Sequence, residues 1–171
     1  MGANPTIRLS IVRSQIDQQQ QVIALLENRL QEVINSDPDV AQNDKLARSV
    51  IGIGPITSAY IISRTNNYTT FDNPRKFACY CGVAPFANSS GTKHGRTKVH
   101  HIANKKLKSL FSNGVAVAIV HDPEISKYFK RKKDEGKKSG VVLNAIKNKM
   151  IHRVFSVIKR QTPYVKLMNY T

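Results

Sequence analysis

The strongest constraint on the fold is a seam of apolar residues that recurs at alternating intervals of four and three over residues 8–35. This spacing keeps one face of an α-helix apolar, as in a coiled coil. The seam consists of Val12, Ile16, Ile23, Leu26, Leu30 and Val33, with the polar Gln19 at the remaining position. An isolated helix of this kind is marginal in water, so a partner helix is required. The partner belongs either to another copy, giving a homodimer or higher oligomer, or to the same chain.

Proline and glycine divide the rest of the chain into further helices. Asp37 and Pro38 suit the N-cap and first position of a helix, so we place a domain boundary there. Residues 1–36 form the long coiled-coil or dimerisation helix, and residues 37–171 form a compact helical domain. We expect helices at about 38–50, 56–65, 74–81, 101–120, 123–133 and 140–160, with brief strand character at 97–100. The fold class is therefore mainly α.

The positive charge is concentrated in the second half of the chain. Residues 1–91 carry 8 basic and 7 acidic residues, whereas residues 92–171 carry 19 and 4, within a formal net charge of +16. Such an excess repels itself unless a polyanion neutralises it, and nucleic acid is the usual partner. A solvated lysine-rich surface is the alternative. A membrane partner is disfavoured because no long apolar run or signal peptide is present, and we expect a cytoplasmic location.

Two glycines lie between the second and third expected helices. Gly52 and Gly54 allow a tight turn, which makes residues 46–59 resemble a helix-hairpin-helix. Its exposed N–H groups, together with the helix N-terminus that carries Thr57, suit contact with a DNA phosphate. The alternative is an ordinary turn between two helices.

A Gly/Ser/Lys-rich loop at 82–100 contains two adjacent hydroxyl groups, those of Ser89 and Ser90. A serine before a glycine is usually turn chemistry. A serine that attacks a phosphodiester needs a base or a metal, and cations to stabilise the extra negative charge of the pentavalent phosphorus. The loop therefore carries either a nucleophile or a phosphate contact.

Cationic residues surround and follow these hydroxyls. The candidates for phosphate contacts within the loop are Lys93, His94, Arg96 and Lys98. His94 is also a candidate proton carrier. Lys105, Lys106 and Lys108 come early on the next helix, with no acid between Asp72 and Asp122, which favours a phosphate-contacting stripe. A second basic segment, residues 127–138, is equally consistent with a solvated surface.

Metal ligands are scarce. Cys79 and Cys81 have no second cysteine pair with which to complete a zinc site, so we expect them to be buried thiols. His100 and His101 have no carboxylate or cysteine at ligand spacing, which favours a structural or DNA-facing role. Beyond residue 91 there are only four acids, too few for a two-metal carboxylate site. We expect no metal or cofactor in this chain.

Several of these segments together resemble one protein family. They are GIGPITSA (52–59), YTTFDNPRKFACYCGVAP (68–85), SSGT (89–92), a basic helix and a terminal apolar helix. This order is similar to the C-terminal serine domain of the DEDD-type, guide-RNA-directed insertion-sequence transposases, which are related to the Piv-type DNA invertases. The resemblance covers about residues 45–165.

The resemblance implies a DNA transposase or recombinase domain. In that family a serine before a glycine forms a phosphoserine link with DNA, and the match falls on Ser90, with Ser89 as the adjacent alternative. The family also implies a guide RNA, dimer assembly through a coiled coil, and an N-terminal RuvC-like domain with four acidic metal ligands. Residues 1–44 cannot hold that domain, so Mg²⁺ is expected only in the full-length enzyme, and we expect this chain alone to be inactive.

Two alternatives to an enzyme follow from the residues. The first is a non-catalytic dimeric module that grips nucleic acid nonspecifically, for which the serines would not matter. The second is a purely structural dimer without nucleic acid.

Overall fold

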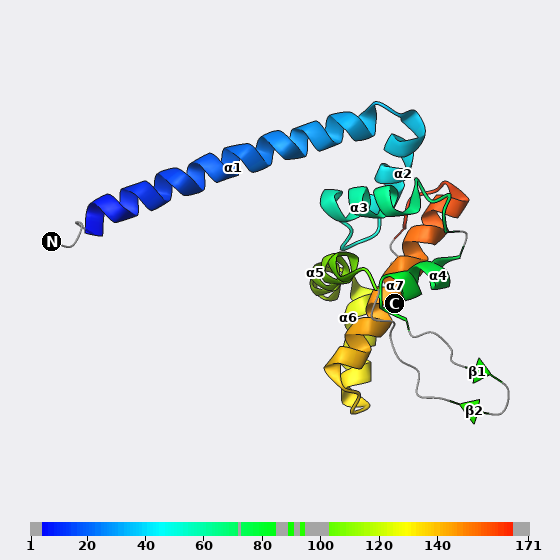
Figure 1. Ribbon diagram of the computed structural model, residues 1–171. Helices are drawn as coiled ribbons and strands as arrows, with labels where there is room; N and C mark the ends of the chain where they lie inside the picture. The colour runs from blue at the N-terminus through cyan, green and yellow to red at the C-terminus, as the bar shows by residue number, and fades with distance from the viewer. Residues whose placement is uncertain (1–4, 72, 85–88, 91–92, 95–102, 166–171) are drawn as a thin grey trace. The chain divides into compact units, whose positions relative to one another are not determined.

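The structure, a computed structural model, describes residues 5–71, 73–84, 89–90, 93–94 and 103–165 (Figure 1). The chain divides into two compact units, residues 1–41 and 42–171. Among the described residues, the only extended elements are two strands of two residues each, and all other regular elements are helices. The predicted mainly-α fold class is therefore confirmed. The predicted division after residue 36 stays a prediction.

The first unit contains one long helix, α1 (Pro5–Asn35), where the sequence predicts a single helix at 8–35. At a rise of 1.5 Å per residue, its 31 residues span roughly 46 Å. Five seam residues remain 50% to 62% exposed: Val12, Ile16, Ile23, Leu26 and Val33. Pairing of this seam with a second helix stays a prediction.

Besides α1, which begins at Pro5, four of the described helices begin at a proline. They are α2 (Pro38–Arg48), α3 (Pro55–Thr65), α4 (Pro74–Tyr80) and α6 (Pro123–Asp134). The residue before the proline caps three of them: a side-chain oxygen of Asp37, Asn73 or Asp122 accepts from backbone N–H groups of the first turn. Proline tolerates the first helical position because its missing N–H would have no partner there.

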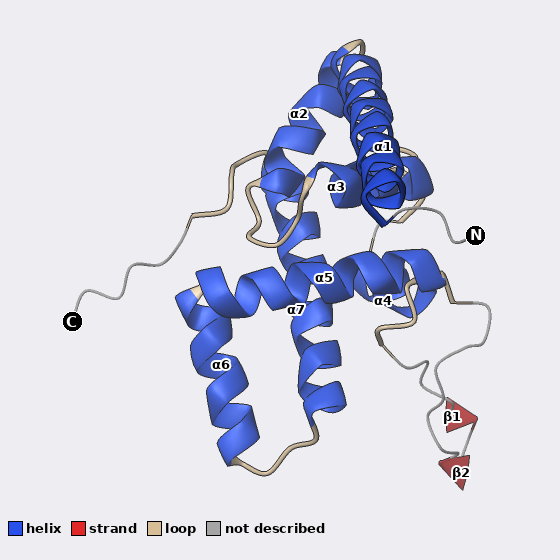
Figure 2. Ribbon diagram, turned by 90° about the vertical axis from the view of Figure 1, so that its left-hand side faces the viewer, coloured by secondary structure: helices blue, strands red, loops and turns tan. Residues whose placement is uncertain are grey.

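The core of the second unit forms around α7 (Ser139–Arg160), which packs against α4, α5 (Lys105–His121) and α6. Figure 2 shows α5 crossing α7, with α6 running antiparallel beside the first half of α7. The predicted apolar stripe on α7 is confirmed, since the following residues are all at most 2% exposed: Val142, Ile146, Met150, Val154 and Val157. Burial of this stripe against three helices removes apolar surface from water and so stabilises the fold.

The turn between α2 and α3 meets the middle of α5 at two glycines. Gly52 has a φ of +90°, a conformation that glycine adopts at little cost. A Cβ built on Gly52 would lie 2.3 Å from the carbonyl oxygen of Gly114, so neither position has room for a side chain. This contact fixes the turn against α5.

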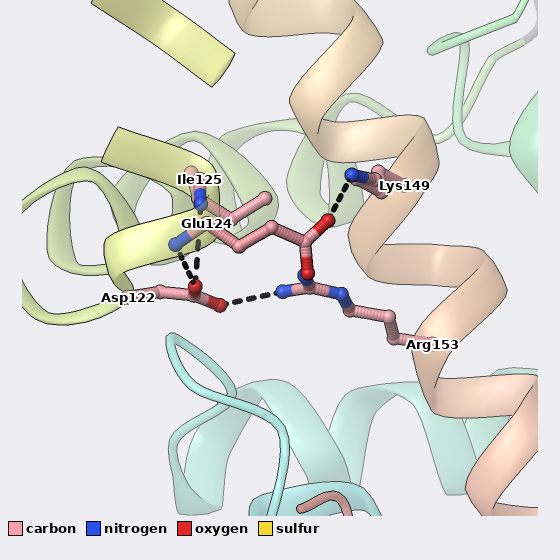
Figure 3. A network of polar contacts seen from close by, with 5 residues as sticks. All are labelled: Asp122, Glu124, Ile125, Lys149 and Arg153. Carbon is pink, nitrogen blue, oxygen red and sulfur yellow. Dashed lines mark hydrogen bonds and ion pairs between the residues drawn. The ribbon is translucent and has the colours of Figure 1, made fainter. Parts of the chain in front are cut away.

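A network of charged side chains joins the start of α6 to α7 (Figure 3). Asp122 is 3% exposed, and its Oδ1 accepts from the backbone N–H groups of Glu124 and Ile125. Its Oδ2 accepts from Arg153 at 2.6 Å, while Glu124 accepts from both Arg153 and Lys149. The α6 N-cap is thereby tied to the middle of α7.

The segment after α4 leads to the serine loop. Gly82, at a φ of +66°, ends α4 as predicted, and the thiols of Cys79 and Cys81 are buried as expected. The two strands are β1 (Ser89–Ser90) and β2 (Lys93–His94). The strand predicted at 97–100 lies outside the described residues. The following helix is predicted to begin at about 101 but begins at Lys105, because the Asn104 side chain caps it by accepting from Leu107 N–H.

Candidate nucleic-acid interface

Ser89 and Ser90 lie on one strand of an antiparallel ladder. In its register Ser89 is opposite His94, and Ser90 is opposite Lys93. The backbone therefore places each of the two serines opposite a residue that is predicted to contact phosphate. Only the backbone of these four residues is described. The predicted contacts Arg96 and Lys98, and also His100 and His101, lie outside the described residues.

The chain on the two sides of the serine loop is held together by hydrogen bonds. The backbone N–H of Asn104 donates to the carbonyl of Tyr80 at 2.9 Å, and the Asn104 side-chain amide donates to the Tyr80 hydroxyl at 3.2 Å. Tyr80 is the last residue of α4, and Asn104 immediately precedes α5. The loop therefore starts and ends at one junction, beside the first turn of α5.

The first turn of α5 carries the three predicted lysines. Lys105 and Lys106 are exposed, Lys108 is half-buried, and no acidic residue lies in this turn. Because a helix N-terminus has a partial positive charge, lysines there are unfavourable in the absence of an anion. The same arrangement of cations and free backbone N–H groups binds phosphate well.

Lys147 adds a cation that the sequence analysis missed. Its side chain extends from α7 and is only 8% exposed, and its ammonium donates to the Asn144 side chain at 3.3 Å. Burial lowers the pKa of Lys147, and the positive charge of Lys108 on α5 lowers it further. In the part of the chain that the structure describes, the hydrogen-bond partner of Lys147 is an amide and not a carboxylate. A buried ammonium beside another lysine leaves positive charge that an external anion would stabilise.

A sequence signal for Lys147 exists. It lies four residues after Leu143 and four before Ile151, which is the spacing of one helix face. A lysine within an apolar stripe is unusual, since lysine is rarely buried without a partner. The predicted apolar stripe on this helix includes Ile146 and Met150 but leaves out Lys147.

Residues 49–54 connect α2 to α3, where the sequence predicts a phosphate-binding helix-hairpin-helix, and that motif and its phosphate contact stay predictions. Gly54 is the N-cap of α3 without a side-chain cap, and a Cβ placed on Gly54 would meet nothing within 4 Å. Gly52 instead contacts α5, and the Thr57 side chain is only 7% exposed. Because Pro55 has no N–H, the backbone N–H groups of Ile56 and Thr57 are the ones that lack an intrahelical partner. The open approach is therefore toward backbone atoms near Gly54.

The second basic segment, residues 127–138, lies mainly on α6, where part of its charge is neutralised. Lys132 pairs with Glu135 at 2.7 Å, and the Arg131 guanidinium lies 3.9 Å from the same carboxylate. Exposed pairs of this kind contribute little to stability. Part of the charge of this segment is therefore paired, whereas no acidic residue accompanies the lysines on the first turn of α5.

The described residues contain no group of three or more His, Cys, Asp or Glu side chains arranged to hold a metal ion. We therefore assign no magnesium ligand to them. Searched over the same residues, no helix is long and apolar enough to cross a membrane.

The chain is similar to proteins that rearrange DNA. Residues 44–130 match the model of the transposase IS116/IS110/IS902 family. The pilin gene-inverting proteins of Moraxella bovis and Moraxella lacunata are each 27% identical to it over 146 residues, which is 84% of this chain and 45% of the relative. An uncharacterised 43.6 kDa protein of insertion element IS110 from Streptomyces coelicolor is 26% identical over 120 residues, which is 70% of this chain and 30% of the relative.

The chain thus spans less than half the length of these curated relatives. The family model covers α3, α4, β1, β2, α5 and most of α6, so it includes the segments that form the candidate interface except Lys147 on α7. It also matches slightly more than half of the chain, which is sufficient to assign the family. The chain belongs to the IS116/IS110/IS902 family of transposases.

Proposed function

We propose that this chain is the strand-exchange domain of a DNA transposase or recombinase, in which Ser90 is the nucleophile and Ser89 the adjacent alternative. The observation that carries the proposal is the hairpin register, with Ser90 opposite Lys93 on a loop held beside the lysine-rich start of α5. Family membership supports DNA as the substrate.

The proposed step is a transesterification at phosphorus. The serine oxygen forms a bond to phosphorus while the bond from phosphorus to the leaving strand oxygen breaks. The hydroxyl proton passes to a base, for which His94 is the candidate, and the leaving oxygen takes up a proton. The product is a phosphoserine ester that keeps the energy of the broken linkage for rejoining to another strand.

Cations around the loop stabilise the charge that develops on phosphorus. Lys93, Arg96 and Lys98 are proposed to contact the reacting phosphate. Lys105, Lys106, Lys108 and the buried Lys147 hold neighbouring phosphates, and the backbone near Gly54 binds a further one. Such fixed charges are effective because they need not reorganise during the reaction.

Further partners belong to the same proposal. A guide RNA is proposed to select the DNA site, and α1 to pair through its exposed seam with α1 of a second copy. Mg²⁺ is proposed to be bound by acidic residues other than those described here, because the described residues contain no group of side chains arranged to hold a metal ion. The relatives are more than twice as long as the matched segment, which is consistent with a separate metal-binding part.

Trapping of a covalent adduct tests the nucleophile. The protein encoded by the complete reading frame is incubated with end-labelled element DNA, guide RNA and Mg²⁺, then denatured and resolved by gel electrophoresis. We expect a labelled protein band that is lost in Ser90→Ala and kept in Ser109→Ala, an exposed serine on α5. Loss in Ser89→Ala alone would move the role to Ser89.

An adduct undiminished in the Ser89→Ala/Ser90→Ala double variant would overturn the nucleophile assignment. Salt-dependent DNA binding that persists in that variant would then favour a non-catalytic nucleic-acid-binding module. The lysines of α5 support that second function equally well, because they bind phosphate whether or not the hydroxyl reacts.

A further inference from the structure

A cavity of about 440 Å³ lies between the segment that joins α3 to α4 and the second half of α7. Its volume is within the range of roughly 300–1,000 Å³ that is usual for small-ligand sites. Its apolar lining includes the aromatic rings of Tyr68, Phe71 and Phe155. None of the residues used so far for the serine loop or the lysine stripe lines this cavity.

The aromatic rings are held in place by one another and by the core. The Tyr68 ring meets the Phe155 ring edge-on, with centroids 5.6 Å apart. Phe71 and Phe155 both contact the fully buried Phe77, at centroid distances of 5.3 and 5.4 Å. Fixed aromatic rings offer stacking surface without a large loss of side-chain entropy on binding.

The backbone at Tyr68 is strained. Asn66, Asn67 and Tyr68 follow one another with φ values of 47°, 52° and 66°. Asparagine tolerates this left-handed conformation, whereas a bulky aromatic residue adopts it rarely. Hydrogen bonds from Tyr68 N–H to the Thr65 hydroxyl and from Asn43 to the Asn67 side chain hold the turn. Strain of this kind persists where the surroundings impose it, and it is concentrated at functional sites.

The Tyr68 hydroxyl is not the group that the cavity offers to a ligand. It is buried without a hydrogen-bond partner among the described residues, close enough to Asp44 for that carboxylate to influence it. The ring faces the cavity while the hydroxyl lies in the interior, so the surface presented to a ligand at this wall is apolar.

The rim of the cavity is cationic and polar. His152, Ser156 and Lys159 lie on one face of α7, all exposed, and no carboxylate is among the lining residues. A neutral apolar ligand or an apolar peptide side chain would not use this rim. A flat aromatic group that carries a phosphate would use both the rings and the lysine.

We propose that this cavity binds an unstacked base of single-stranded DNA, which stacks on the Phe155 ring and meets the perpendicular Tyr68 ring edge to face, while Lys159 contacts the adjacent phosphate. The inference rests on the proposed role in DNA strand exchange, in which strands must separate, but it does not depend on which serine reacts. Bases of every kind present a π-face, so the site holds a base without reading its identity.

Fluorescence of a single-stranded DNA oligonucleotide with one 2-aminopurine tests the proposal with the complete chain. Stacking on an aromatic ring quenches this base, so we expect quenching on binding at low salt. Ser156→Leu adds a non-aromatic side chain at the cavity wall and removes nothing from the core. We expect it to abolish the quenching and to weaken single-strand binding about tenfold, with duplex affinity changed less than about twofold and the far-UV circular dichroism unchanged.

If Ser156→Leu fails to fold, a charge-matched pair of variants still tests the proposal. Lys159→Ala removes a cation that lines the cavity, whereas Arg160→Ala removes the neighbouring exposed cation, which does not line it. We expect a loss of quenching with Lys159→Ala alone. Equal effects of both variants, or quenching retained in Ser156→Leu, would overturn the base site.

An RNA oligonucleotide of the same sequence is the second arm. Quenching with RNA and none with DNA would overturn the assignment to DNA. Failure of the base site is distinguishable from failure of the proposed function, because the serine adduct is measured separately with wild-type cavity residues.

Discussion

Gly52 and Gly114 touch backbone to backbone, so closely that a Cβ on either glycine would stand 2.3 Å from the carbonyl oxygen of the other. The first lies in the turn before α3, and the second lies inside α5. Glycine is ordinarily unfavourable within a helix. Its presence at position 114 therefore has a packing reason, because only a glycine lets the turn before α3 approach α5.

We expect Gly114→Ala to destabilise the protein by about 1–3 kcal/mol, the usual cost of overpacking, although alanine is the better helix former. Gly140→Ala is the matched control, since a Cβ there would meet nothing within 4 Å. We expect that variant to be neutral or more stable by up to about 1 kcal/mol. Urea unfolding midpoints measure both changes, and equal stabilisation by the two alanines would contradict the close contact.

Loss of the Asp122 carboxylate removes an N-cap and one partner of Arg153, whose side chain is 10% exposed. Breaking a buried pair in this way costs about 3–5 kcal/mol, and we expect Asp122→Ala to lie near the lower limit because Glu124 still holds the guanidinium. Glu135→Ala, which removes an exposed pair with Lys132, is expected to leave the midpoint unchanged. A small effect of Asp122→Ala would show that the network of Figure 3 does not anchor α6.

The pKa of Glu124 is lowered below its ordinary value of 4.5, first by the hydrogen bond from Lys149 and then by the charges of Arg153 and Lys149, against the opposing charge of Asp122. The folded state therefore binds this proton less readily than the unfolded state. The resulting stabilisation is complete above about pH 4.5 and is lost as the pH falls through the lower, folded pKa. We expect the difference in unfolding midpoint between wild type and Glu124→Gln to be constant from pH 7 to 6 and to shrink below pH 4.5. A difference that grows on acidification would contradict this sign.

Replacing Lys147 is expected to weaken DNA binding without lowering the stability of the fold. A buried ammonium without a carboxylate partner is costly, so Lys147→Met is expected to keep or raise the unfolding midpoint. The same change should weaken duplex DNA binding and reduce the slope of log affinity against log salt by about 0.9, the value for one phosphate contact. Lys130→Met, on the exposed face of α6, is the control with the same change of charge. An unchanged affinity and slope in Lys147→Met would remove this residue from the interface.

Local patterns predicted much of this fold. The capping side chains of Asp37, Asn73 and Asp122, each followed by a proline, start helices where the sequence places them, because a cap satisfies N–H groups within two or three residues of itself. The α5 boundary was less accurate, since Asn104 competes with the preceding residues as the cap. The seam of α1 predicts a helix correctly but not its partner, since an exposed apolar face is compatible with several partners.

The candidate site could be predicted only in part. Lys105, Lys106 and Lys108 are recognisable because they are neighbours in the chain without intervening acids, and their place on the first turn of α5 is as expected. Lys147 was missed because its meaning depends on Lys108, which another helix carries. Ser89, Ser90 and the other residues of the loop stay predictions as contacts of DNA.

The sequence by itself determined the helices, their caps and the concentration of positive charge, because these depend on residues a few positions apart. The tertiary structure alone decided that Gly52 meets Gly114, that Lys147 lies beside Lys108, and that Tyr68 and Phe155 enclose one cavity. The reason is physical. Helix propensity acts along the chain, whereas contacts between distant residues depend on how whole helices pack, and many packings are compatible with the same pattern of apolar stripes.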